Sequence, residues 1–166
     1  MQNESAARPL CPDYADFPAI PLYKDQVVSF LSEALAPFDG GEEMAVTAAR
    51  INNYVKLKVI APPEKKKYSR EQLICLYVVF LLKQVLSMEE IRALLQEEFP
   101  PDQAEISYRW LCAQLDRAVR DGPEGLGALD EGHPLLDAAL RSFLYRRQAA
   151  LLLRRRADVS PPSQLE

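Results

Sequence analysis

Histidine, cysteine and glycine are scarce in this chain of 166 residues, which has one histidine, three cysteines and six glycines. With His133 alone, neither histidine-based catalysis nor a histidine-rich metal site is expected. The cysteines Cys11, Cys75 and Cys112 are odd in number, widely spaced and without a CxxC pair. This argues against a disulfide framework and a zinc site, and fits a reducing, cytoplasmic location. We therefore expect no enzyme and no cofactor or metal.

Long apolar runs are also lacking. The longest is Leu73–Leu82, which is about half of the roughly twenty residues that a membrane-spanning helix needs. Residues 1–22 contain four prolines and no apolar run typical of an export signal. We expect no membrane association, and the prolines predict an extended arm rather than a helix.

Acidic residues are nearly absent from two segments of a chain whose net charge is −4. Residues 50–70 carry seven lysines and arginines against Glu64 alone, and residues 141–156 carry six arginines and no acid. Each segment is therefore +6, which leaves −16 on the rest of the chain. The net charge disfavours a nucleic-acid partner, but its segregation provides two basic segments that could meet a polyanion.

Apolar residues at helical spacing and helix-capping residues predict a mainly α fold. Ser69–Gln72 and Ser87–Glu90 have the pattern of a capping box, and Asp25 and Thr47 are candidate N-caps. We expect helices over residues 26–36, 48–58, 70–86, 88–99, 104–120 and 135–157. No strand is expected, except beside the basic loop 64–68.

The order helix, turn, helix, basic loop, helix over residues 26–86 is typical of a DNA-binding module. Arg50, Asn53 and Lys56 follow each other at intervals of three and share one helix face, where asparagine and arginine can contact base edges. The three lysines of residues 65–67, on a proline-stiffened loop, suit phosphate contact. The alternative is that these side chains are simply solvated.

Residues 47–95 resemble the winged helix-turn-helix of the MerR regulators. That family has a recognition helix T-I-R-Y-Y-E-x-x-G-L-I, then proline, a basic wing ending in tyrosine, and two more helices. Arg50–Tyr54 matches the first half of the recognition helix, and Lys58–Ile60 stands in place of Gly-Leu-Ile. Lys66–Tyr68 matches the end of the wing, Ser69–Leu73 the junction after it, and Leu86–Ile91 the start of the fourth helix.

A closer likeness, over about residues 20–120, is to an uncharacterised bacterial family of unknown function that shares this MerR-like core. The motifs are Y-x-D-Q-V, I-N-N-Y-x-K, P-P-x-K-K-K-Y-S-x-E and L-K-Q-x-L-S-x-x-E-I. They correspond here to Tyr23–Val27, Ile51–Lys56, Pro62–Glu71 and Leu82–Ile91. The resemblance implies a DNA-binding regulator.

The chain also departs from the MerR pattern. Asn52 stands where that family has arginine, Asn53 where it has tyrosine or histidine, and Val55 where it has glutamate. The base-contacting residues of that family therefore cannot be transferred to this chain. Lys58 replaces a C-cap glycine, and the connection 37–46 is longer than an ordinary turn.

The leading hypothesis is a mainly α transcriptional regulator with a MerR-like winged helix-turn-helix core and additional C-terminal helices. It comprises an extended arm (1–24), the winged domain (25–99) and a helical region (100–166) for dimerisation or effector sensing. The partner is double-stranded DNA, read by helix 48–58 and wing 62–68, with a homodimer and an unidentified small-molecule effector left open. The predicted base contacts are Arg50, Asn52, Asn53 and Lys56. The predicted phosphate contacts are Thr47, Tyr54, Lys65, Lys66, Lys67, Tyr68 and Arg70.

Two alternatives stay open. The acidic remainder and the missing MerR residues favour a protein–protein interaction module on a winged-helix scaffold without DNA binding. The arginines of residues 141–156 could instead bind RNA, although arginines also favour a helix C-terminus through its dipole.

Overall fold

The computed structural model describes residues 9–159, and the sequence expectations for residues 1–8 and 160–166 lie outside the described residues. The fold is mainly helical. The α-helices are α1 (Lys24–Leu35), α2 (Ala48–Lys56), α3 (Arg70–Leu82), α4 (Met88–Glu98), α5 (Ala104–Asp121) and α6 (Pro134–Val159). Short 3-10 helices are η1 (Tyr14–Asp16), η2 (Ala36–Phe38), η3 (Gly41–Met44) and η4 (Pro123–Leu126), and the strands are β1 (Leu22–Tyr23) and β2 (Lys67–Tyr68).

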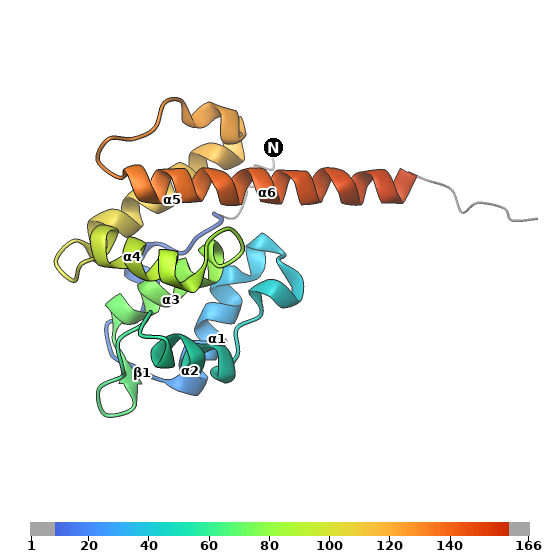
Figure 1. The fold of residues 1–166 in the computed structure, drawn as a ribbon. Helices are drawn as coiled ribbons and strands as arrows, with labels where there is room; N and C mark the ends of the chain where they lie inside the picture. The colour runs from blue at the N-terminus through green and yellow to red at the C-terminus, as the bar shows by residue number, and fades with distance from the viewer. Residues whose placement is uncertain (1–8, 160–166) are drawn as a thin grey trace, which may run out of the picture.

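The helix α3 is the centre of the fold, as its all-round apolar sequence predicts. Every residue from Leu76 to Leu82 is buried, and α1, α4, α5 and α6 all pack against it. The long helix α6 crosses one end of the molecule, and its C-terminal part projects beyond the body (Figure 1). Within residues 9–159, no helix has the length and apolar character needed to cross a membrane.

The predicted caps of three helices are confirmed. Thr47 Oγ1 accepts a hydrogen bond from the Arg50 amide at 3.2 Å. Ser69 and Gln72 form a complete capping box at the start of α3, and Ser87 and Glu90 form another at the start of α4. These local contacts explain why the starts of the three helices are predictable from the sequence.

The N-terminal arm is not extended throughout. This segment contains η1 and β1, and the Phe17 side chain is fully buried. The Phe17 ring makes edge contacts with the rings of Tyr77 and Tyr108, with ring centroids 6.1 and 5.0 Å apart. The segment is therefore an integral part of the core, because an aromatic side chain buries a large apolar area.

The first helix also starts earlier than predicted. It begins at Lys24 after Tyr23, whose backbone amide donates to Gln26 Oε1 at 2.9 Å, so Asp25 is not the N-cap. The strand left open beside the basic loop is present, and β1 and β2 pair antiparallel with Leu22 opposite Tyr68.

Candidate nucleic-acid interface

The exposed face of α2 is created by the burial of its opposite face. Ile51 and Tyr54 are buried in the core, with exposed fractions of 0% and 4%. Because a helix turns about once every 3.6 residues, Asn52, Asn53 and Lys56 then point to solvent, and all three are exposed. The predicted base-contacting side chains other than Arg50 thus lie on an accessible surface.

Arg50 is placed differently. Its Nη1 atom donates to the backbone carbonyl oxygens of Glu42 at 2.8 Å and Ala45 at 2.6 Å. The guanidinium group therefore holds the connection containing η3 against the start of α2. Arg50 lies at the edge of the exposed α2 face, and its contacts are those of a positioning residue.

Lys24 is a cation that the sequence reasoning missed. Its Nζ atom donates to Asn52 Oδ1, across 28 positions of the sequence. Lys24 thus links the start of α1 to the exposed face of α2. Lys24 lies in the Y-x-D-Q-V motif of residues 23–27, but only the tertiary structure brings it next to Asn52.

The end of α2 has the geometry usually supplied by glycine. The amide of Val59 donates to the Tyr54 carbonyl at 2.9 Å, and the amide of Lys58 donates to the Val55 carbonyl at 3.0 Å. These two bonds form a Schellman motif, and Lys58 has the left-handed φ of 59° that the motif requires. The lysine that replaces a C-cap glycine therefore adopts the conformation of that glycine.

The basic loop ends in a tight hairpin turn. The Lys67 amide donates to the Glu64 carbonyl at 2.9 Å, and Lys65 and Lys66 between them have φ angles of 48° and 65°. Two consecutive positive φ angles are typical of a type I′ turn, which normally has Asn-Gly in these positions. Both lysines are exposed at the tip of the turn.

Side chains around the loop fix the hairpin to the body. Gln72 Nε2 donates to the carbonyl oxygens of Ala61 at 2.9 Å and Pro62 at 3.1 Å. Lys67 Nζ lies 4.9 Å from the centroid of the Tyr23 ring, a cation–π contact with β1. Tyr23 thus contacts the hairpin, and the next residue, Lys24, contacts Asn52 of α2. The start of α1 therefore links the hairpin to the exposed face of α2.

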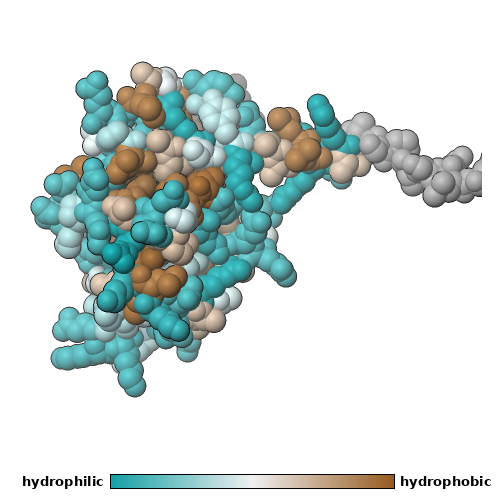
Figure 2. Space-filling model, viewed as in Figure 1, coloured by the Kyte–Doolittle hydropathy of each residue, from teal (hydrophilic) through white to brown (hydrophobic). Residues whose placement is uncertain are grey.

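The hairpin and α2 lie at the same end of the molecule (Figure 1). The space-filling view shows long hydrophilic side chains projecting at this end, around the position of the hairpin (Figure 2). Lysines face solvent here on three different segments. We call this surface the basic face: Lys24, Asn52, Asn53, Lys56, Lys58, Lys65, Lys66 and Lys67.

Two predicted phosphate contacts are in the core instead. Tyr54 and Tyr68 are 4% and 1% exposed, and burial raises the pKa of both phenols. For Tyr54, the nearby Arg50 charge partly opposes this rise in pKa. These side chains support α2 and the hairpin from inside, so we remove them from the contact set.

Arg70 and Thr47 also have internal roles. Arg70 Nε donates to the Phe17 carbonyl at 3.0 Å, and its guanidinium carbon lies 4.8 Å from the centroid of the Tyr14 ring. The side chain thus ties the start of α3 to the N-terminal segment. The Thr47 hydroxyl accepts the capping bond described above, and its side chain is exposed beside α2.

A second polar group lies away from the basic face, where α4, α5 and α6 meet. His133 Nδ1 is 2.8 Å from Glu98 Oε2, and the Asp137 carboxylate binds both the Arg141 guanidinium and the Asp130 amide. Arg141 also donates to the carbonyl of Gly127 at 2.7 Å. These contacts fold the glycine-rich connection onto α6, so His133 is partly buried rather than a surface residue. Within residues 9–159, no group of three or more His, Cys, Asp or Glu side chains is arranged to hold a metal ion.

Comparison with known proteins identifies a family. A family model described as "Domain of unknown function (DUF1836)" matches residues 12–111. No curated protein and no solved structure matches the chain. The matched region runs from the N-terminal segment into α5, and it includes the whole basic face. Because the model covers more than half of the sequence, the chain belongs to the DUF1836 family.

Proposed function

We propose that this protein is a DNA-binding transcriptional regulator whose core is a MerR-like winged helix-turn-helix. In this proposal α2 lies in the major groove and the loop of residues 62–68, with its hairpin tip, is the wing. Asparagine side chains can pair with adenine edges in two hydrogen bonds, so Asn53 and Asn52 supply base recognition. The lysines of the basic face contact phosphates, which fix the position of the protein on the duplex.

The observation that carries the proposal is the conformation of Lys65 and Lys66. Both are held in the left-handed region at the tip of a hairpin, where glycine or asparagine would cost less. Strained conformations of this kind concentrate at functional sites, because the rest of the fold must compensate for them. Two adjacent long cations at a protruding tip are suited to a phosphate backbone.

The basic face also resolves the conflict with an acidic chain. Six lysines lie on it, from residues 24, 56, 58 and 65–67. If about six phosphates are neutralised, the logarithm of the binding constant should fall with the logarithm of salt concentration with a slope of about −5.

The C-terminal region has a different role in this proposal. Arg146 and Arg154 of α6 bind Glu43 at 2.6 Å and Asp39 at 3.1 Å, in the connection between α1 and α2. These contacts support α6 as the element through which a second copy or an effector would influence α2. We propose a homodimer, since a two-fold protein suits a palindromic site.

The test is fluorescence anisotropy with DNA from upstream of the protein's own gene and with a scrambled duplex. Lys65→Glu with Lys66→Glu should weaken binding to both duplexes. Asn53→Ala should mainly reduce the preference for the specific duplex. The matched control is Arg117→Glu with Arg120→Glu, which changes the charge equally on exposed positions of α5 and should weaken binding less.

A specific observation favours a second function, a protein–protein interaction module. Leu152 and Leu153 are 53% and 67% exposed on the projecting end of α6, where apolar residues lie next to hydrophilic ones (Figure 2). Exposed apolar side chains on a projecting helix can pack against a partner protein. Equal binding of wild type and both charge variants to DNA would refute the regulator proposal and leave this one.

A further inference from the structure

We propose that Cys11 and Cys112 are a redox pair that a hydroperoxide converts to a disulfide within one chain. Cys11 lies in the N-terminal segment and Cys112 lies on α5. A bond between them would join two elements that are 101 positions apart in sequence and that the fold already packs together. This inference is independent of DNA binding.

The two sulfur atoms meet through a shared set of contacts. Cys11 and Cys112 lie near enough for each thiol to change the pKa of the other. Cys112 Sγ also lies 3.8 Å from the carbonyl oxygen of Pro12, the residue after Cys11, and the Tyr108 hydroxyl donates to the same oxygen at 2.6 Å. The segment carrying Cys11 is thus fixed to the turn of α5 that carries Cys112.

A buried polar atom marks the same place. The Tyr77 hydroxyl on α3 is fully buried and has no hydrogen-bond partner. The Tyr77 ring makes an edge contact with the ring of Tyr108, with centroids 5.8 Å apart, and Tyr108 binds the Pro12 carbonyl beside Cys11. An unpaired buried hydroxyl is costly in a core that serves only packing.

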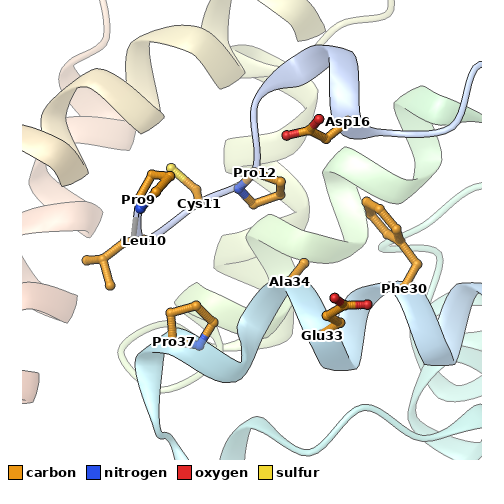
Figure 3. Close-up of a pocket in the computed structure, with 9 residues that line it drawn as sticks. All are labelled: Pro9, Leu10, Cys11, Pro12, Asp16, Phe30, Glu33, Ala34 and Pro37. Carbon is orange, nitrogen blue, oxygen red and sulfur yellow. The ribbon is translucent and has the colours of Figure 1, made fainter. Parts of the chain in front are cut away.

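An open cavity reaches the pair on the side of Cys11. The cavity has a volume of about 290 Å³ between the N-terminal segment and α1, and Cys11 forms part of its wall. Figure 3 shows Cys11 with Pro9 and Pro12 on one side of this space, and Ala34 and Pro37 on the other. Cys112 is itself partly exposed. A peroxide is far smaller than this cavity.

The contacts divide the work between the two thiols. Proximity to Cys11 lowers the pKa of Cys112, against the opposing effects of burial and of the carboxylates of Asp116 and Asp13. The contact with Cys112, together with burial, raises the pKa of Cys11 well above its ordinary value. Cys112 is also the more exposed of the two residues, since Cys11 is buried. We therefore assign Cys112 as the attacking thiol and Cys11 as the second.

The reaction has two balanced steps. The Cys112 thiolate attacks the terminal oxygen of the hydroperoxide, the O–O bond breaks, and the other oxygen leaves as an alkoxide, or as hydroxide if the oxidant is hydrogen peroxide. This oxygen takes up the proton that Cys112 released on ionising and becomes an alcohol or water. The resulting Cys112 sulfenic acid is attacked by the Cys11 sulfur, which forms the S–S bond. Hydroxide leaves and takes the Cys11 thiol proton as water, so two thiols are oxidised by two electrons and one hydroperoxide is reduced.

The test uses the full reduced chain treated with one equivalent of hydrogen peroxide and then alkylated in denaturant. Trypsin separates the three cysteines, because Lys24, Arg70, Lys83, Arg109 and Arg117 provide cleavage sites between them. We expect a linked peptide pair carrying Cys11 and Cys112, and the loss of two of the three free thiols on a monomeric chain. Cys75→Ala, the matched control, should form the same linked pair.

Two further variants separate chemistry from folding. Cys112→Ser should leave Cys11 as a free thiol, whereas Cys11→Ser should leave Cys112 as a sulfenic acid that dimedone traps. The peptide map of the wild-type chain tests the proposal even if either variant fails to fold. A link between other cysteines or between chains, or oxidation of Cys75 before Cys112, would overturn the proposal.

Discussion

Replacing Lys65 with Asn and Lys66 with Gly should stabilise the protein and weaken its binding to DNA. The structure places both lysines at positive φ, 48° and 65°, between Glu64 and Lys67 in a tight turn. A residue with a Cβ atom in the left-handed region costs about 1–2 kcal/mol, which asparagine tolerates better and glycine avoids. Glycine also loses more entropy on folding, by about 0.5–1 kcal/mol.

The net gain for the two positions is therefore about 1–2 kcal/mol in the free energy of unfolding. For a chain of 166 residues this corresponds to a rise in Tm of about 2–8 °C, at roughly 2–4 °C per kcal/mol. Removing two phosphate contacts should also reduce the magnitude of the salt slope by about 1.8. Urea unfolding and anisotropy titrations at several salt concentrations measure the two effects separately.

The control is Lys65→Ala with Lys66→Ala. This variant loses the same two charges but keeps side chains with a Cβ atom in the left-handed region. It should lose DNA affinity to the same extent and gain no stability. If the Asn-Gly variant and the Ala-Ala variant are equally stable, the turn is not strained by its lysines. If the salt slope of either variant equals that of the wild type, the tip of the turn does not contact phosphate.

Three further predictions concern residues with roles inside the fold. Phe17→Ala should reduce the free energy of unfolding by about 3–5 kcal/mol in urea, because it empties a buried aromatic site, whereas Ile20→Ala, at a position 75% exposed, should change it little. Arg50→Ala should lower the free energy of unfolding by about 1–2 kcal/mol, because the carbonyl groups of Glu42 and Ala45 lose their hydrogen-bond donor. If Arg50→Lys is as stable as the wild type, the geometry of the guanidinium group has no role in this contact. Hydrogen bonds from the Trp110 indole and the Gly132 amide lower the pKa of Asp130 in the folded protein. The ionised carboxylate therefore stabilises the fold at pH values above its unfolded pKa of about 3.9. This contribution is lost as the pH falls through the lower pKa of the folded state. The stability difference between wild type and Asp130→Asn should accordingly be present at neutral pH and disappear in strong acid, and a difference that persists there would count against these bonds.

The sequence predicted those features that depend on neighbouring residues. The starts of α2, α3 and α4 follow from Thr47, Ser69 and Ser87, whose side chains bond to amides three residues ahead. The central position of α3 follows from its continuous apolar composition. The left-handed Lys58 was also visible indirectly, as a lysine standing where a related pattern has glycine.

Contacts between distant residues were not predictable in this way. Arg70 looked like a phosphate contact because it follows three lysines, yet its Nε atom binds the Phe17 carbonyl, 53 positions away. Arg50 looked like a base contact because of its helical spacing, yet its guanidinium satisfies carbonyls of η3. Helical spacing defines the direction of a side chain's Cβ atom, whereas a long side chain can turn back to any acceptor within reach.

The same reasoning explains why the cations of the basic face are lysines, whereas the arginines next to it bind groups inside the fold. The planar guanidinium group has several donors in a fixed arrangement, and Arg50 and Arg70 use it to bind backbone carbonyls in the body of the fold. Lysine is a flexible point charge, which suits contacts with phosphates in varied positions. Arginine at position 66 would therefore retain the charge of the wing, and binding that fell as far in Lys66→Arg as in Lys66→Ala would show that the tip does more than supply charge.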